Sequence, residues 1–471
     1  MTQTAMRGIG ELRALMDGPV IAPADNEFDD GRRVWNASID RRPQVIARCV
    51  SPTDVATALG FARRNGLEVS VRGGAHAPAG SAVSDGGLMI DLSLLNAVMV
   101  DPAARLARVG GGALLADLDA ATQAHGLAVP AGLVSHTGVG GLTLGGGMGW
   151  LTRKFGLSID NLVSAKVVTA DGQVLRAAAD EHPNLFWAIR GGGGNFGVVT
   201  GFEFNLHEFG PMVQFGLFFW RLDQGTQALR LAREITAAMP ANLNAVIAAV
   251  NAPPAPFVPE EYQFTPGYAL LLTGFGSGPE HGQVVTRIRE SLPPLFELIT
   301  PMPYVQLQTL LDEANAWGSC CYDKGAYLPD LSDPVIEVIT GHVQAKVSPA
   351  SALLLYRLDG AYSQVGDDET AFSGGRSPRY AAFMVGLTPD PGALAAERAW
   401  VRGLWEALRP HAVDGVDGYI NSTSEYSGDG VRGSYGPAKY DRLARIKAAY
   451  DPGNVFHLNA NIPPLPRRGG D

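Results

Sequence analysis

The stretch from Val69 to Asp91, VSVRGGAHAPAGSAVSDGGLMID, decides the fold of this chain. Alternating residues at 67–71 predict a strand that enters the glycine pair Gly73-Gly74, and a second strand is predicted near 88–91. Adjacent glycines let successive backbone N–H groups turn toward one point, which makes a concavity for an anion such as a pyrophosphate. His76 lies at the edge of this loop, where a histidine is more often a structural turn residue than a ligand contact. On these residues alone both interpretations stay open.

A second glycine-rich stretch runs from Pro130 to Trp150 and holds eight glycines in twenty-one residues. This density argues against a packed helix and against a central strand. Apolar residues are interleaved throughout the stretch, which disfavours a merely flexible loop. We therefore expect this backbone to lie against something flat and phosphorylated.

A third stretch, from Gly192 to Gly197, matches the pattern G-x-G-x-x-G literally. A dinucleotide fingerprint of this kind follows a strand and opens a helix. Here a helix is predicted before it, at 184–189, and a strand after it, at 198–206. Because the order is inverted, the sequence argues against a Rossmann-type nicotinamide site.

The remaining pattern divides the chain in two. Up to residue 206 the sequence predicts a strand–helix–strand unit, with a helix opened by Ser51-Pro52 and stopped at Asn65-Gly66, followed by hairpins. From Pro211 the glycine loops disappear and strands alternate with helices, which predicts a broad sheet covered by helices. The strands are expected at 214–221, 268–274, 352–358 and 381–387, and the helices at 227–239, 282–292 and 394–408.

Composition narrows the class of protein. The chain has 471 residues, enough for two or three domains, and a net charge of −10 that argues against nucleic acid and anionic membranes as partners. Three cysteines, Cys49, Cys320 and Cys321, give neither a disulfide framework nor a metal-binding spacing, so free thiols in a reducing compartment are expected. We see neither a signal peptide nor an apolar run of membrane-spanning length, and expect a cytoplasmic protein.

Taken together, the glycine stretches and the tail from Tyr450 to Ile462 resemble the berberine bridge enzyme-like FAD-linked oxidases of the vanillyl-alcohol oxidase superfamily. The resemblance covers nearly the whole chain and is loosest in its middle third. It is carried by Ser51-Pro52, Asp91-Leu92-Ser93, Gly138-Val139-Gly140-Gly141, Asp160-Asn161 and Thr169-Ala170-Asp171-Gly172, in family order. The stretch from Gly132 to Gly147 is similar to the bacterial subgroup of 6-hydroxy-D-nicotine oxidases.

This resemblance implies an α+β fold, with a PCMH-type FAD-binding domain of two subdomains and an α+β substrate domain whose antiparallel sheet is covered by helices. Residues 1–206 would form the first part of the FAD-binding domain and residues 207–414 the substrate-binding domain. Residues 415–471 would return to the FAD-binding domain. A monomer and a homodimer both stay open.

The family also implies how FAD is held. His76 falls at the position that carries the flavin through its 8α-methyl group, and Val134 stands where many members attach the flavin a second time through a cysteine. We therefore expect a single covalent link, through His76. The residues expected against the cofactor are Arg72, Gly73, Gly74, Ala75, His76, Gly80, Ser81, Ala131, Gly132, Val134, Thr137, Gly138, Gly140, Gly141, Thr143, Leu144, Gly147, Gly149, Trp150, Asn161, Gly197, Val198, Val199, Asn459 and Asn461.

The family's usual bases do not carry over. Ser422 stands where plant members often have a catalytic tyrosine, and Gln364 aligns near the catalytic glutamate of berberine bridge enzyme. The remaining candidates are Tyr419, Tyr362 and His136, of which Tyr419 is our first choice. A core tyrosine with a satisfied hydroxyl is an equally good interpretation of Tyr419.

The function that the resemblance implies is hydride transfer from a small-molecule substrate to flavin N5, with O2 reoxidising the flavin to give H2O2. A flavin dehydrogenase with another electron acceptor and a non-catalytic flavin or small-molecule carrier are the alternatives. Sugars, alcohols, phenolic compounds and cyclic amines all stay open as substrates.

Overall fold

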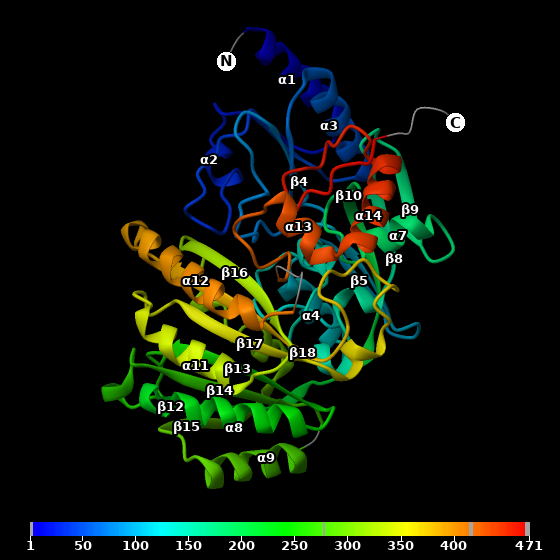
Figure 1. Cartoon of the computed structure of the whole chain (residues 1–471). Helices are drawn as coiled ribbons and strands as arrows, with labels where there is room; N and C mark the ends of the chain where they lie inside the picture. Colours follow the sequence, from blue (N-terminus) through cyan, green and yellow to red (C-terminus); the bar gives the residue numbers. More distant parts are fainter. Residues whose placement is uncertain (1–2, 277, 414–417, 467–471) are drawn as a thin grey trace.

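The glycine loop that follows Val69 lies at the edge of a four-stranded sheet in the computed structural model, which describes residues 3–276, 278–413 and 418–466 (Figure 1). The strand order is β1-β2-β4-β3, with β2 and β3 both parallel to β4. The strands are β1 (Val20–Ile21), β2 (Val45–Arg48), β3 (Val69–Arg72) and β4 (Leu88–Asp91).

Helix α3 (Pro52–Asn65) connects β2 to β3 and has the boundaries that the sequence predicts. The hydroxyl of Ser51 accepts a hydrogen bond from the backbone N–H of Asp54 at 3.1 Å, which caps the first turn. Gly66 ends the helix with φ of +62°, a left-handed conformation that glycine adopts without strain. The strand–helix–strand prediction is confirmed.

The second sheet has five strands, all antiparallel, in the order β5-β6-β10-β8-β9. The predicted hairpin forms between β8 and β9, and Gly172 takes φ of +90° between them. The third glycine stretch lies between α7 and β10, so its order is inverted as expected. The elements here are β5 (Val98–Asp101), β6 (Leu106–Gly110), β8 (Leu162–Val168), β9 (Val174–Ala178), β10 (Val198–Asn205), α4 (Leu115–Gln123) and α7 (Pro183–Ile189).

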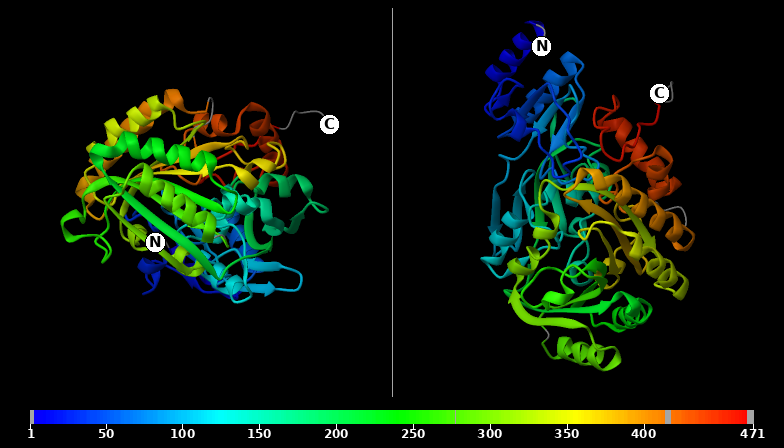
Figure 2. Two further views of the ribbon diagram at one scale, coloured as in Figure 1. Left: turned by 90° about the horizontal axis from the view of Figure 1, so that it is seen from below. Right: turned by 90° about the vertical axis from the view of Figure 1, so that its left-hand side faces the viewer.

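The third sheet has seven antiparallel strands, and helices cover one of its faces (Figures 1 and 2). Its order is β15-β12-β14-β13-β17-β18-β16. The strands are β12 (Met212–Arg221), β13 (Leu243–Asn251), β14 (Pro266–Gly274), β15 (Phe296–Pro303), β16 (Cys320–Leu328), β17 (Ala352–Leu358) and β18 (Arg379–Thr388). The covering helices are α8 (Gly225–Ala238), α9 (Gly278–Ser291), α11 (Asp333–His342) and α12 (Leu394–Leu408).

The α+β class is thus confirmed, together with the four strands and three helices expected after Pro211. The strands β13, β15 and β16 and the helix α11 are not predicted from the sequence pattern. The chain also contains α1 (Gln3–Leu15), α2 (Phe28–Gly31), α6 (Thr152–Phe155), α10 (Tyr304–Gln308), and the pair β7 (Leu127–Ala128) and β11 (His207–Glu208). No helix among the described residues is long and apolar enough to cross a membrane.

The two faces of the seven-stranded sheet have different partners because successive side chains in a strand point to opposite faces. On one face, Tyr322, Leu353 and Met384 pack against the covering helices. The other face of the same three strands carries Cys321, Asp323, Leu354, Tyr356, Phe383 and Val385, all of which line an internal cavity. Asp323 lies directly opposite Val385 in the register of β16 and β18.

The C-terminal segment returns to the first half of the chain through α13 (Gly428–Tyr435) and α14 (Pro437–Tyr450). The buried ammonium group of Lys447 donates to the carbonyl oxygens of Asn195 and Phe456, at 2.7 and 2.9 Å, and to the carboxylate of Asp451 at 2.6 Å. These bonds fix the tail beside the third glycine stretch. The expected domain boundary between residues 414 and 415 lies outside the described residues, and the division into domains stays a prediction.

One local prediction is wrong. The second glycine stretch was expected to contain no helix, and it contains α5 (Val139–Gly145). The helix is short, and its first turn lies against the His76 loop so closely that a Cβ atom on Gly138 would be 2.3 Å from the backbone nitrogen of Gly74. Tertiary packing here outweighs the low helix propensity of glycine.

Candidate active site

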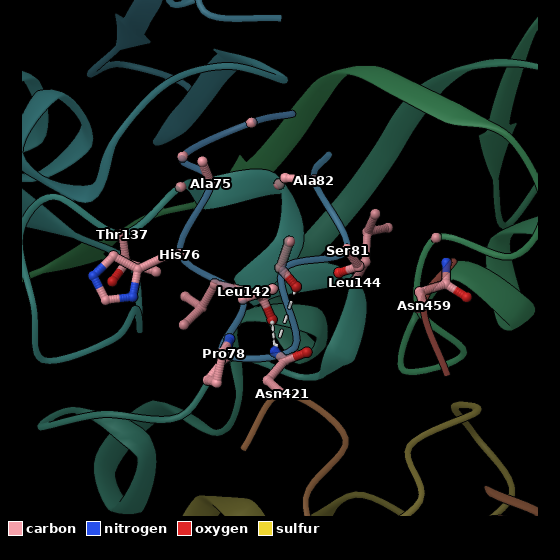
Figure 3. Close-up of a pocket in the computed structure, with 18 of the residues that line it drawn as sticks. Ala75, His76, Pro78, Ser81, Ala82, Thr137, Leu142, Leu144, Asn421 and Asn459 are labelled. Carbon is pink, nitrogen blue, oxygen red and sulfur yellow. Dashed lines mark hydrogen bonds between the residues drawn. The ribbon is translucent and has the colours of Figure 1, made fainter. Parts of the chain in front are cut away.

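A cavity of about 420 Å³ lies where the glycine loops, the seven-stranded sheet and the C-terminal tail meet. This volume is in the range of small-molecule and cofactor sites. Figure 3 shows His76 beside Thr137, Asn459 well apart from them, and Leu142, Leu144 and Asn421 between. Most of the residues expected against FAD line it: Gly73, Gly74, Ala75, His76, Ser81, Gly132, Val134, Thr137, Gly138, Gly140, Gly141, Leu144, Gly197, Val198, Val199 and Asn459.

The other expected cofactor residues do not line the cavity. Arg72 lies 3.9 Å from the carboxylate of Asp91, and Asn161 donates to the carbonyl oxygens of Phe155 and Leu157 at 2.9 Å. Trp150 is buried in the apolar core under the large sheet. The remaining expected residues outside the lining are Gly80, Ala131, Thr143, Gly147, Gly149 and Asn461.

The glycines let the His76 loop and the second glycine stretch come into direct backbone contact. A Cβ atom on Gly74 would lie 2.2 Å from the backbone nitrogen of Gly138. In contrast, a Cβ atom on Gly141 would meet nothing within 4 Å. The loops are therefore tight where they contact each other and open where they line the cavity, which is what a ligand lying against bare backbone requires.

His76 is held on two sides. The indole of Trp35 stacks on its ring at 4.4 Å between centroids and 17° between planes, and Nε2 of His76 lies 3.1 Å from Nδ1 of His136. Burial, with a contribution from His136, lowers the pKa of His76 to about 3. The imidazole is therefore neutral at physiological pH and keeps a nucleophilic lone pair.

The tail contains two unsatisfied acceptors, one of which lies at the cavity. The side-chain oxygens of Asn459 and Asn461 are buried and have no hydrogen-bond partner in the described part of the chain. Asn195 fixes this segment, because its amide donates to the carbonyl oxygen of Ala460 and its oxygen accepts from the N–H of Ile462, both at 3.0 Å. A buried amide oxygen without a partner is costly, so a ligand donor is expected at Asn459, which lines the cavity.

Of the candidate bases, only Tyr419 lines the cavity. Its hydroxyl oxygen accepts hydrogen bonds from the N–H of Gly147 and from the amide of Asn421, both at 2.9 Å. Burial raises the pKa of Tyr419 to about 12, although both hydrogen bonds act in the opposite direction. At neutral pH the phenol is therefore uncharged and joins two segments, which favours the interpretation as a satisfied core tyrosine.

The structure does not bring Tyr362 or Gln364 to the cavity. Tyr362 is fully buried elsewhere, where it donates to the carbonyl oxygen of Gly375, and burial raises its pKa. Gln364 is exposed at the end of the short helix Gly360–Gln364. His136 is half-buried behind His76 and contacts its ring.

Asp323 is the acidic group that the sequence analysis missed. It lies on β16, is 5% exposed and lines the cavity. The hydroxyls of Ser422 and Ser424 donate to its two carboxylate oxygens, at 3.1 and 3.0 Å. Burial raises the pKa of Asp323 to about 7, although the two serines lower it. The only sequence signal is a lone acidic residue inside the largely apolar run Cys320–Leu328.

Comparison with known proteins agrees with this geometry. Residues 43–178 match the model of an FAD binding domain, and residues 418–463 match the family described as berberine and berberine like. The chain is 33% identical over 460 residues to (R)-6-hydroxynicotine oxidase of Paenarthrobacter nicotinovorans, which covers 95% of this chain and 97% of the relative. An FAD-linked oxidoreductase of Dictyostelium discoideum is 29% identical over 465 residues, covering 97% of each chain.

Solved structures give the same result. The crystal structure of 6-hydroxy-D-nicotine oxidase from Arthrobacter nicotinovorans superposes with a TM-score of 0.83 at 30% identity, covering 95% of this chain and 98% of that one. A BBE-like protein of Physcomitrella patens shares the fold. It superposes with a TM-score of 0.86 at 23% identity, covering 97% of this chain and 99% of that one. The fold is thus the PCMH-type flavin-binding fold that the sequence predicts, and the chain belongs to the berberine bridge enzyme-like family of FAD-dependent oxidoreductases.

Proposed function

We propose that this protein is an oxidase that removes a hydride from a small, largely apolar alcohol or amine, with FAD attached by one covalent bond to His76. The observation that carries the proposal is that His76 and the buried carboxyl group of Asp323 line the same cavity. The two residues come from different halves of the chain, so the cavity combines a place for the cofactor with a proton acceptor.

The residues present fit FAD. The loops around Gly74 and Gly138 offer bare backbone, and Asn459 offers an unsatisfied acceptor. FAD, when bound, supplies the redox chemistry: it accepts the hydride and passes two electrons to O2, which becomes H2O2. The protein supplies orientation, exclusion of water and a proton acceptor.

Asp323 is our candidate for that acceptor. Removing a hydride from the carbon of an alcohol or amine requires that the O–H or N–H proton also leaves. A base is most effective when its pKa lies near the working pH, and burial places the pKa of Asp323 at about 7. Ser422 and Ser424 hold the carboxyl group in place from the C-terminal segment.

The rest of the wall suggests the kind of substrate. Around Asp323 the sheet presents Leu354, Tyr356, Phe383 and Val385 to the cavity. A carbohydrate would bury several hydroxyls here, and each one without a partner would cost about 1–3 kcal/mol. An apolar molecule with one hydroxyl or amino group matches one carboxyl group beside these four largely apolar side chains.

A single attachment is supported by the residues near the cavity. Val134 lines the wall at the position of the second link and has no nucleophilic atom. Cys321 also lines the cavity, but burial raises the pKa of its thiol, which therefore stays protonated. Cys49 and Cys320 do not line the cavity.

The test is a substrate screen that reads H2O2, with aryl alcohols and cyclic amines set against oligosaccharides. We expect peroxide in equal amount to the apolar substrate consumed, and prompt return of the yellow oxidised flavin when an anaerobically photoreduced sample meets air. Slow return in air would instead indicate a dehydrogenase with another acceptor. Failure of every compound to bleach the flavin anaerobically would favour a non-catalytic carrier.

A further inference from the structure

The candidate base lies on an edge strand of its sheet. Asp323 belongs to β16, the last strand in the sheet order, whereas Leu354 and Phe383 of the apolar wall lie on β17 and β18, which are paired on both sides. An edge strand has one row of backbone N–H and C=O groups that face no neighbouring strand. The position of Asp323 therefore depends on what bonds to this free edge of β16.

The free edge is bonded by an N-terminal arm, residues 35–37, and by the C-terminal segment. The backbone N–H of Asp323 donates to the hydroxyl of Ser424 at 2.9 Å, and its carbonyl oxygen accepts from the N–H of Ser424 at 3.1 Å. Just before the strand, the N–H of Ala37 donates to the carbonyl oxygen of Ser319 at 2.9 Å. Between these two points the edge is held by the side chain of Asn36.

Asn36 replaces a neighbouring strand at one position of the edge. Its Oδ1 accepts from the backbone N–H of Cys321 at 2.9 Å, and its Nδ2 donates to the carbonyl oxygen of Cys321 at 2.9 Å. Two opposite residues of antiparallel strands exchange the same pair of bonds. The second Nδ2 hydrogen goes to the carbonyl oxygen of Pro78 at 2.7 Å. Asn36 is 1% exposed, so bulk water does not compete for these bonds.

Pro78 belongs to the His76 loop and lines the cavity (Figure 3). The arm contacts this loop a second time, because the backbone N–H of Trp35 donates to the carbonyl oxygen of Ala75 at 3.0 Å. Asn36 therefore joins the loop that is expected against FAD to the strand that carries the candidate base.

The spacing along β16 connects this contact to Asp323. Cys321 lies two residues before Asp323, so both backbones face the free edge and both side chains face the cavity. Two residues of a strand span about 7 Å. A movement of β16 away from the arm at Cys321 would therefore also displace the carboxyl group of Asp323.

We propose that Asn36 is a positioning residue for substrate oxidation, which fixes Asp323 relative to the His76 loop by bonding Cys321 and Pro78 at the same time. This inference rests on the proposed function of Asp323 as the base. Asn36 does not line the cavity and so contacts no reacting atom. A base must be within about 2.6–3.2 Å of its proton partner, and a misplacement of about 1 Å can slow a reaction roughly 10²-fold.

The test is anaerobic stopped-flow reduction of the flavin, with the aryl alcohol or cyclic amine that is fastest in the peroxide screen as the probe. In Asn36→Ala we expect reduction at saturating probe to be roughly 10–10²-fold slower, with FAD content unchanged. The Kd of the probe should change little, because the apolar wall lies mainly on strands paired on both sides. Asn36→Asp keeps the size of the side chain but, when ionised, donates to neither carbonyl oxygen, so it should be slow as well.

A double mutant separates positioning from a purely structural role. In an Asp323→Asn background, Asn36→Ala should cause no further loss of rate, because no carboxyl group is left to position. A structural role alone would lower Tm and leave the rate at saturating probe unchanged. The matched control is Gln123→Ala, which removes an amide that donates to the carbonyl oxygens of Leu127 and Phe209 at 2.8 and 3.1 Å, away from the cavity lining, and should reduce at the wild-type rate.

Hydrogen exchange in the wild-type holoenzyme tests the contact without a variant. Resolved to single amides, it should show the N–H of Cys321 protected, although this N–H lies on the free edge of β16. Exchange of this amide as fast as in an unstructured peptide overturns the inference. So does a wild-type reduction rate in Asn36→Ala or Asn36→Asp, and so does a full additional loss in the double mutant.

The same measurements separate this inference from the proposed function. If Asp323→Asn is slow and Asn36→Ala is normal, the role of Asn36 is wrong and the assignment of the base stands. If Asp323→Asn reduces its flavin at nearly the wild-type rate, the assignment of the base is wrong and the role of Asn36 falls with it.

Discussion

The change Ser422→Ala should move the pH dependence of substrate oxidation without removing any group that reacts. Ser422 donates one hydrogen bond, of 3.1 Å, to the carboxylate of Asp323. That bond stabilises the charged form, so its loss makes the carboxyl group harder to ionise. The rate should therefore require a higher pH to reach its plateau.

The size of the shift follows from the hydrogen bond. A hydrogen bond to a charged group contributes about 1.5–3 kcal/mol, and one pKa unit corresponds to about 1.36 kcal/mol. Ser424 keeps its bond at 3.0 Å and water can replace part of the lost one, so we expect a rise of about one unit. The acidic limb should move from about pH 7 to about pH 8, and the rate well below both values should fall about tenfold.

The assay is anaerobic stopped-flow reduction of the flavin between about pH 5.5 and 9.5. Ser373→Ala is the matched control, because it removes an equally buried hydroxyl that has no hydrogen-bond partner among the described residues and does not line the cavity. Asp323→Asn should lose the acidic limb altogether and slow reduction by roughly 10²–10⁴-fold. An unmoved limb in Ser422→Ala, or near-normal reduction in Asp323→Asn, would refute the assignment of Asp323 as the base.

Three further changes test other parts of the site. His76→Ala should release its flavin on acid precipitation and turn over more slowly, and mapping of wild-type peptides should show flavin on His76 alone, with Cys321 unmodified. Tyr419→Phe should leave the acidic limb near pH 7, because the phenol is neutral with a pKa of about 12; a 10²–10⁴-fold loss would restore Tyr419 as the base. Asp119 is fully buried, and burial raises its pKa to about 7 in the folded protein, against about 3.9 in the unfolded chain. Between these two pH values the native state binds a proton that the unfolded state has lost. The protein therefore loses stability as the pH rises from the lower value to the higher one. The Asp119→Asn variant has no carboxyl group to ionise and does not lose this stability. Its Tm relative to wild type should therefore be higher at pH 8 than at pH 5. An equal difference in Tm at both pH values would show that ionisation of Asp119 does not destabilise the folded protein.

The parts of the structure that the sequence predicts well depend on neighbouring residues. The cap at Ser51, the stop at Gly66 and the turn at Gly172 are each decided within a few positions of the chain. The His76 loop belongs to the same class, because adjacent glycines have local consequences for the backbone. Predictions of this kind need no knowledge of the sheet order.

Asp323 could not be found in this way. Its burial depends on pairing between β16 and β18, and its serine partners are 99 and 101 residues away in the sequence. Of the other candidates, Tyr362 is buried beside Gly375 and Gln364 is exposed, so neither lines the cavity. Their placement depends on the packing of the surrounding segments, which neighbouring residues do not decide.

Burial at the same cavity acts on both groups to which we assign a reaction. Removal from water disfavours the charged form of any group, so it lowers the pKa of the imidazole of His76 and raises that of the carboxyl of Asp323. The first effect leaves a neutral nucleophile for attaching the cofactor, and the second leaves a carboxylate that is a stronger base than one in water. Neither group needs an oppositely charged neighbour to reach this state. In the function that we propose, the apolar wall around Asp323 therefore contributes to reactivity as well as to substrate choice, because it keeps water from restoring both pKa values to their ordinary range.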